Sequence, residues 1–126
     1  MARTTITDDT LTITMTGLRR IGTFRNEITV PLAHVRGATW DPGISTRWPG
    51  LRQAGTWPGY KRLGTDVPGR YLGGTFVQDG EPVFWDVKDP EKAVVITLTD
   101  EEFVRVIVEV DDPESVVREI ETALAH

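Results

Sequence analysis

The chain has 126 residues, of which 39% are hydrophobic, and it contains no cysteine. This length predicts a single domain over residues 1–126, with a core large enough to fold without a disulfide or a structural metal. The lack of cysteine excludes thiolate zinc sites and a cysteine nucleophile, and it favours a reducing compartment, so we expect a cytoplasmic protein. No apolar run approaches the roughly 18 residues that cross a bilayer, so we expect no transmembrane segment.

Charge is distributed unevenly along the chain. The net charge is −5, from 14 Lys and Arg residues against 19 Asp and Glu residues. Residues 17–72 hold nine basic and three acidic residues, a balance of +6, whereas residues 73–126 hold four basic and fourteen acidic residues, a balance of −10. The acidity of the whole chain argues against a dedicated nucleic-acid-binding protein, so nucleic acid is not an expected partner.

The first elements predicted are strands. Leu11, Ile13 and Met15 alternate with threonines, a period-2 pattern typical of a half-buried strand over residues 10–16. Residues 18–24 then suggest a short helical turn or bend. A second strand begins at Ile28, and Pro31 indicates an edge, a bulge or a tight turn before residues 35–40 continue it as a kinked strand.

The middle of the chain predicts a long loop followed by a β-meander. Residues 41–59 contain four glycines and three prolines, a density of breakers typical of a long ordered loop. Strand-like runs follow at residues 60–65, 71–77, 82–87 and 93–98, with a hairpin turn signal at residues 78–80. Residues 94–98 and 104–110 then form a hairpin whose alternate apolar side chains predict the firmest part of the core.

One helix is predicted at the end of the chain. Asp112 is an N-cap candidate, Pro113 suits the first helical position, and Glu114 suits the first turn. The side chains of the expected buried face are Val116, Val117, Ile120, Ala123 and Leu124; those of the polar face are Arg118, Glu119, Glu121 and Thr122. Adjacent carboxylates at Asp8/Asp9, Glu101/Glu102 and Asp111/Asp112 are interpreted as turn and cap residues.

The order of these elements resembles a known family. ITVPLAHV at residues 28–35, GGTF at residues 73–76 and DDPE at residues 111–114 are similar to segments of small bacterial pleckstrin-homology-like (PH-like) proteins that lack a transmembrane segment. The resemblance covers residues 10–125. It implies a mainly β (α+β) fold, a bent antiparallel sheet or barrel of about seven strands capped by one C-terminal helix.

The family resemblance leaves the ligand open. PH-like folds serve lipid, peptide and self-association roles. Eukaryotic relatives that bind phosphoinositides use a basic cluster opened by lysine, whereas this chain has Arg19, Arg20 and Arg25 in that region and no lysine before Lys61. Phosphoinositide is therefore not an expected partner.

One basic-aromatic segment is the candidate binding site. Its residues are Arg47, Trp48, Arg52, Trp57, Tyr60, Lys61 and Arg62. Planar rings beside cations suit an anionic or aromatic partner. The alternative interpretation is that the tryptophans fold the loop onto the core and leave the cations as solubilising charges.

No residue pattern indicates a reaction. The two histidines are His34 and the terminal His126, Ser45 lacks a nucleophile elbow, and Gly73-Gly74 lacks the Lys-Ser/Thr of a phosphate loop. We therefore expect no catalytic residue, no metal and no cofactor. The function predicted is a non-catalytic binding or assembly module, docking a protein partner or a second copy through residues 42–62 and exposed sheet edges. The alternatives are a small hydrolase or transferase with a pocket around His34, and a structural homo-oligomer.

Overall fold

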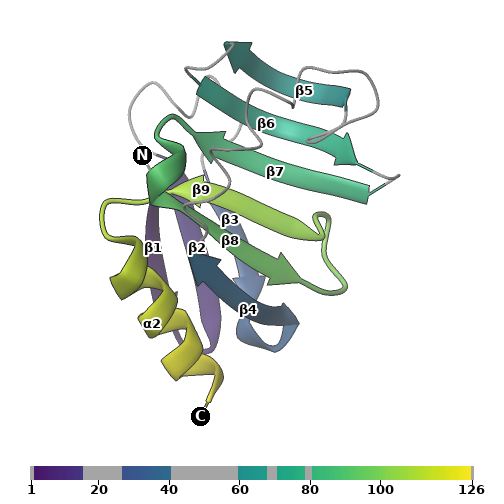
Figure 1. The fold of residues 1–126 in the computed structure, drawn as a ribbon. Coiled ribbons are helices and arrows are strands. Elements are labelled where there is room, and N and C mark those ends of the chain that lie inside the picture. The colour runs from purple at the N-terminus through teal and green to yellow at the C-terminus, as the bar shows by residue number, and fades with distance from the viewer. Residues whose placement is uncertain (1, 16–26, 41–59, 68–70, 79–80, 126) are drawn as a thin grey trace.

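The computed structural model of the chain describes residues 2–15, 27–40, 60–67, 71–78 and 81–125, with the backbone alone described for residues 60–67, 71–72, 78 and 90. Within these ranges the fold comprises two β-sheets and one C-terminal helix (Figure 1). The smaller sheet has the order β1-β2-β3, formed by Ala2–Thr7, Thr10–Met15 and Glu27–Pro31. The larger sheet has the order β4-β8-β9-β7-β6-β5. Its strands are Val35–Trp40 (β4), Tyr60–Val67 (β5), Tyr71–Gln78 (β6), Glu81–Val87 (β7), Ala93–Leu98 (β8) and Arg105–Glu109 (β9).

The alternation in β2 confirms the first predicted strand. Leu11 and Ile13 are fully buried and Met15 is nearly so, while the threonines between them are half-buried. Strand β1 precedes β2 and was not predicted. A two-residue turn joins the two strands, with Asp8 at φ 50° and Asp9 at φ 64°, which confirms these carboxylates as turn residues.

Residues 28–40 do not form one kinked strand, so that prediction was wrong. Strand β3 ends at Pro31, a 3₁₀ turn spans Leu32–His34, and β4 then enters the other sheet. Strand β3 is an edge strand, as the proline indicated. Register alternation places position 31 where a backbone N–H would point away from β2, so proline removes no hydrogen bond from the sheet.

The larger sheet is not a simple antiparallel meander. Strands β5, β6 and β7 are antiparallel neighbours, but β7 pairs with β9 in parallel, and β8 lies between β9 and β4. The predicted hairpin of β8 and β9 is confirmed, and it is this hairpin that brings β9 beside β7. Among the described strands both sheets are open, so of the expected sheet or barrel the barrel is not formed. The expectation of antiparallel pairing throughout was also wrong, because β7 and β9 are parallel.

The main core lies between the small sheet and the β4, β8 and β9 half of the large sheet. It buries β2 and β3 side chains against Val94, Ile96, Val106 and Val108. A second buried cluster contains Phe76, Val83, Trp85, Val87, Ala93 and Ile107. Because neighbouring residues of a strand point to opposite faces, this second cluster lies on the other face of the large sheet. The hairpin of β8 and β9 is therefore central to the hydrophobic core, as predicted.

The C-terminal helix α2, Pro113–Leu124, forms as predicted. The Asp112 side chain accepts a hydrogen bond from the backbone N–H of Ser115 at 3.2 Å, an N-cap with proline directly after it. Ile120 is fully buried, and Val116, Val117 and Leu124 pack against the core. The helix contacts β4, β8 and β1 (Figure 1), so it closes the side of the core where edge strands of the two sheets meet.

Candidate functional site

Most of the predicted basic-aromatic site cannot be placed. Arg47, Trp48, Arg52 and Trp57 lie outside the described residues, as do the predicted bend at residues 18–24 and the loop at residues 41–59. Tyr60, Lys61 and Arg62 begin β5, the edge strand of the large sheet opposite β4, and only their backbone is described. Their role in binding stays a prediction.

His34 has a partner that sequence reasoning did not foresee. Its Nδ1 lies 2.5 Å from Oε2 of Glu101, in the turn between β8 and β9. The backbone of His34 is tied to the same region, because its carbonyl accepts a hydrogen bond from the N–H of Thr99 at 2.9 Å. The two side chains are 35% and 22% exposed, so the pair lies at the edge of the core and joins the 3₁₀ turn to the β8–β9 turn.

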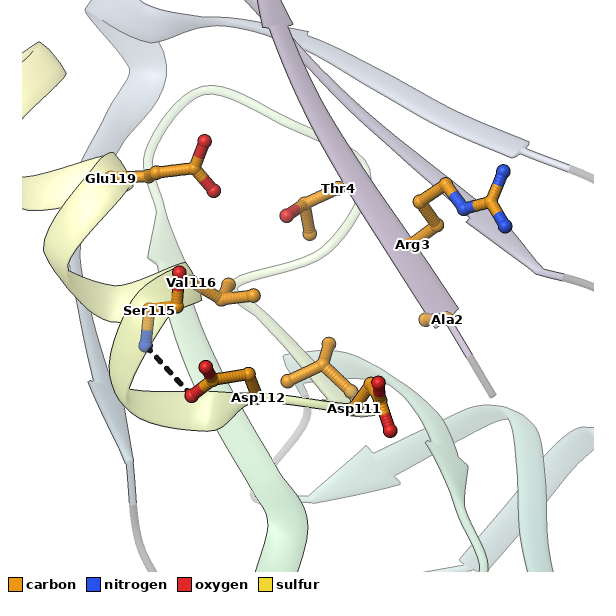
Figure 2. A pocket seen from close by; sticks show the side chains of 9 residues that line it. Ala2, Arg3, Thr4, Asp111, Asp112, Ser115, Val116 and Glu119 are labelled. Carbon is orange, nitrogen blue, oxygen red and sulfur yellow. Dashed lines mark hydrogen bonds between the residues drawn. The ribbon is translucent and has the colours of Figure 1, made fainter.

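A hollow of about 500 Å³ lies between the start of β1 and the start of α2 (Figure 2). One wall is Ala2, Arg3 and Thr4 of β1, and the opposite wall is Ser115, Val116 and Glu119 of α2. Its floor is the segment 110–112, which connects β9 to the helix. This volume is within the range typical of ligand sites in proteins.

A second hollow, also about 500 Å³, continues along the same two elements. It is lined by Ile6 of β1 and by Ser115, Arg118, Glu119, Thr122 and Ala123 of α2. Because both hollows include Ser115 and Glu119, we treat them as one feature and call it the β1–α2 groove. The groove runs along β1 from residue 2 to residue 6 and along α2 from residue 115 to residue 123.

The backbone of β1 has a free side that faces this groove. The turn has positive φ at both Asp8 and Asp9, the type I′ geometry in which the flanking residues Thr7 and Thr10 form a hydrogen-bonded pair. Alternation then directs the backbone N–H and C=O groups of Thr4 and Ile6 away from β2. On that side, the described ranges show one strand pairing, the parallel bridge between Ala2 and Val110 at the end of the groove.

The groove is acidic near the helix N-terminus. Asp111, Asp112 and Glu119 line it, and all three are exposed. Figure 2 shows the side chain of Glu119 directed toward the β1 side of the groove and that of Arg3 directed away from the helix, on the far side of β1. Arg3 belongs to the wall of this hollow through β1, but its guanidinium points away from Glu119.

No protein-family model matches this chain, and no curated protein or solved structure matches it significantly. The described residues contain no group of three or more His, Asp or Glu side chains placed to hold a metal ion. Among the described helices, none is long and apolar enough to cross a membrane. The groove places an open strand edge opposite a polar helix face, a geometry that offers backbone hydrogen-bonding groups on one side and charged side chains on the other.

Sequence reasoning did not find the groove because it did not find β1. Residues 2–7 contain only two apolar side chains, too few for a hydrophobic period. Two signals were present: a run of β-branched residues over 4–7, and a two-residue turn signal directly before the alternation of β2. Exposed sheet edges were predicted as contact surfaces, but which edge stays open depends on tertiary packing.

Proposed function

We propose that this chain is a non-catalytic PH-like binding module that takes up an extended segment of a protein partner beside β1. The observation that supports this most directly is the β1–α2 groove, where the free backbone side of an edge strand faces a helix across an open hollow. An extended segment that adds a strand to a sheet edge gains main-chain hydrogen bonds, and its alternate side chains fill neighbouring pockets.

Two of the other edge strands, β3 and β4, have features that block pairing with a further strand, and this favours β1 over them as the docking edge. Unpaired strand edges invite aggregation, and proteins usually block them. Edge strand β3 carries Pro31 at a position whose backbone nitrogen faces outward. Edge strand β4 is covered by α2, because Oε1 of Glu121 accepts a hydrogen bond from the N–H of Ala38 at 3.1 Å. Strand β1 has no such device beyond the bridge at Ala2, and the groove lies along it.

The His34–Glu101 pair is the observation on which a catalytic function would rest. An acid-base pair needs a substrate site beside it. The hollow that Glu101 lines, between β3 and the β8–β9 turn, has a volume of about 80 Å³ and does not include His34. This is below the size typical of substrate pockets, which favours a structural role for the pair.

The basic-aromatic segment defined above is proposed as a separate contact for an acidic partner. Within it, Arg52, Lys61 and Arg62 are expected to speed association, and Trp48 or Trp57 to slow dissociation. Reversing the three charges to glutamate should therefore flatten the dependence of the association rate on salt.

Selection of displayed peptides tests the β1–α2 groove directly. Random decapeptides displayed on phage are selected for binding to the wild-type chain. The affinities of the selected peptides are then measured for two proline variants. Thr4→Pro removes an N–H that points into the groove, without removing a hydrogen bond between β1 and β2. Thr29→Pro is the matched control, because alternation places the N–H of Thr29 on the outward side of edge strand β3, away from the groove.

The expected result is a set of peptides that bind the wild-type chain and Thr29→Pro but lose at least about tenfold in affinity on Thr4→Pro, the loss that several main-chain hydrogen bonds imply. Circular dichroism confirms that both variants remain folded. Failure to select any peptide, or equal binding to both variants, contradicts the proposed function. Peptides displaced by unlabelled wild-type chain, together with a dimer in sedimentation velocity, would instead indicate that a second copy occupies β1.

A further inference from the structure

The two halves of the β1–α2 groove differ in chemistry. The half near the helix N-terminus carries Asp111, Asp112 and Glu119. The half further along shares Ser115 and Glu119 with the first half and adds half-buried Ile6 and Ala123, with Arg118 and Thr122 beside them. A segment lying in the groove therefore meets carboxylates at one end, whereas at the other end it meets Ile6 and Ala123, with Arg118 offsetting the charge of Glu119.

The negative charge in the first half is available to a ligand. Asp112 uses one carboxylate oxygen to cap the helix through Ser115. Glu119 projects from the middle of the helix toward β1, one turn after Ser115 (Figure 2). In the described part of the chain, no ion pair or side-chain hydrogen bond occupies Glu119, and Arg3 points away from it. A cation at this point gains Coulomb attraction from Glu119, and the exposed carboxylates of Asp111 and Asp112, which line the same half of the groove, add to it at longer range.

The spacing of the two walls matches the repeat of an extended chain. In β1, Thr4 and Ile6 are two residues apart, which corresponds to about 6.7 Å along a strand. On α2, Glu119 and Ala123 are four residues apart, which corresponds to about 6 Å along a helix. Thr4 and Glu119 line the first hollow, and Ile6 and Ala123 line the second. The distance from one hollow to the next is therefore similar along β1 and along α2.

We infer that the groove selects a segment of a partner protein in which a Lys or Arg and an aliphatic residue are two positions apart. The basic side chain lies beside Glu119, and the aliphatic side chain lies between Ile6 and Ala123. Successive side chains of a strand point to opposite faces, so a spacing of two places both on the same side, facing the helix. This inference rests on the proposed function, since it assigns side-chain selectivity to the same groove.

The charge of the groove also decides which class of ligand it excludes. Three carboxylates repel the phosphates of nucleic acids and anionic lipid headgroups. In the second half Arg118 offsets the charge of Glu119, so no net charge favours a second basic residue there and the position two residues along should be uncharged. The preferred segment therefore has a cationic residue and, two residues along on the same face, an apolar residue.

Three fluorescein-labelled nonapeptides test the selectivity. The first is Gly-Thr-Thr-Lys-Thr-Val-Thr-Thr-Gly, and the others have alanine or glutamate in place of the lysine. Their affinities for the full chain are measured by fluorescence anisotropy at low and high salt. Glu119→Gln removes the groove carboxylate that faces β1 and leaves Asp111 and Asp112. Glu114→Gln is the matched control, because it removes one exposed charge from the same helix outside the groove lining.

We expect the lysine peptide to bind most tightly and the glutamate peptide at least about tenfold more weakly. Glu119→Gln should weaken the lysine peptide about threefold, the range of an exposed ion pair, and leave the alanine peptide unchanged. Glu114→Gln should change both by less than about twofold. The advantage of lysine should shrink at high salt, because screening weakens the attraction of exposed charges.

The outcomes separate the two proposals. If all three peptides bind equally and Glu119→Gln changes none of them, the charge selectivity is wrong while the groove remains a binding site. If no peptide binds at any concentration that stays soluble, both proposals are wrong. Backbone N-methylation of the lysine peptide tests the strand geometry without altering the protein. One peptide is methylated at the central threonine and another at the valine, because adjacent N–H groups of a strand point to opposite sides and one of the two must face β1. Unchanged binding of both methylated peptides overturns the assignment of an extended bound form.

Discussion

The carboxylate of Glu121 on α2 accepts a hydrogen bond from the backbone N–H of Ala38 in β4, with 3.1 Å between nitrogen and Oε1. This contact joins residues 83 positions apart in the chain. Because β4 is an edge strand, the hydrogen bond gives the helix a second role besides covering the core: it satisfies a strand edge that would otherwise face outward. Gly37 lies at the same place, where an added Cβ would stand 3.5 Å from Oε1 of Glu121, an ordinary contact distance.

Replacing Glu121 should show how much its hydrogen bond to Ala38 contributes to the free energy of unfolding. We expect Glu121→Ala to lower the free energy of unfolding by about 1 kcal/mol, because a backbone donor loses a charged acceptor at a partly exposed site. Glu121→Gln should cost less than half of that, since an acceptor oxygen remains. Urea denaturation followed by circular dichroism gives both values. Glu119→Ala, on the same helix, should change stability by less than about 0.5 kcal/mol, and an equal loss in this control would show that the effect is one of helix propensity.

Ile120 should be the most sensitive position of the helix. It is fully buried and packs into the cluster between the sheets, so Ile120→Ala should lower the free energy of unfolding by about 2 to 4 kcal/mol. Thermal or urea unfolding measures the change. The exposed neighbour Thr122, replaced by alanine, provides the comparison. A loss below about 0.5 kcal/mol at Ile120 would contradict the placement of this helix face on the core.

Glu109 is a buried carboxylate with a structural role. It is 4% exposed, and its Oε1 accepts hydrogen bonds from the backbone N–H groups of Lys88 and Asp89 at 2.9 and 3.1 Å. We expect Glu109→Ala to cost about 2 to 3 kcal/mol, because two backbone donors lose a charged acceptor. Glu109→Gln should cost less. Amide hydrogen exchange should accelerate at Lys88 and Asp89 in the alanine variant before it changes in β8, and uniform acceleration would argue against this local role.

The His34–Glu101 contact is open to a double-mutant cycle. His34→Gln, Glu101→Gln and the double variant should give a coupling energy of about 0.5 to 1 kcal/mol, because both side chains are partly exposed to water. Urea unfolding of the four proteins supplies the cycle. A coupling near zero would mean that the hydrogen bond from Thr99 to the carbonyl of His34 holds the two turns together without the side chains.

The turn between β1 and β2 is suboptimal for its geometry. Asp8 and Asp9 both have positive φ, a region that asparagine and glycine adopt at lower cost. The double change Asp8→Asn and Asp9→Gly should therefore raise the free energy of unfolding by about 0.5 to 1 kcal/mol, because the relief of two positive-φ conformations exceeds the extra backbone freedom that glycine gives the unfolded chain. Thermal unfolding checks this. A loss of stability would show that contacts of the two carboxylates contribute more to the free energy of unfolding than the relief of backbone strain does.

Local patterns determined most of the elements of this protein. The alternation of Leu11, Ile13 and Met15 predicted β2 correctly, and the strands around residues 60–98 were placed within two residues of their observed ends. The helix was also predicted from its cap, its proline and the spacing of its apolar face. These predictions succeeded because a capping group, a turn residue or a period of burial acts over a few neighbouring positions.

Only the tertiary structure decided how the strands are arranged and which edge stays open. Nothing in the local pattern of β7 distinguishes a neighbour in β8 from one in β9, because every strand offers the same backbone groups on both sides. The division of residues 28–40 between two sheets likewise depends on packing across the core. Strand β1 has few apolar side chains, and it is held by pairing with β2 and by the bridge from Ala2 to Val110. The β1–α2 groove follows from that bridge and from the path of the chain into the helix, which are contacts between the two ends of the sequence.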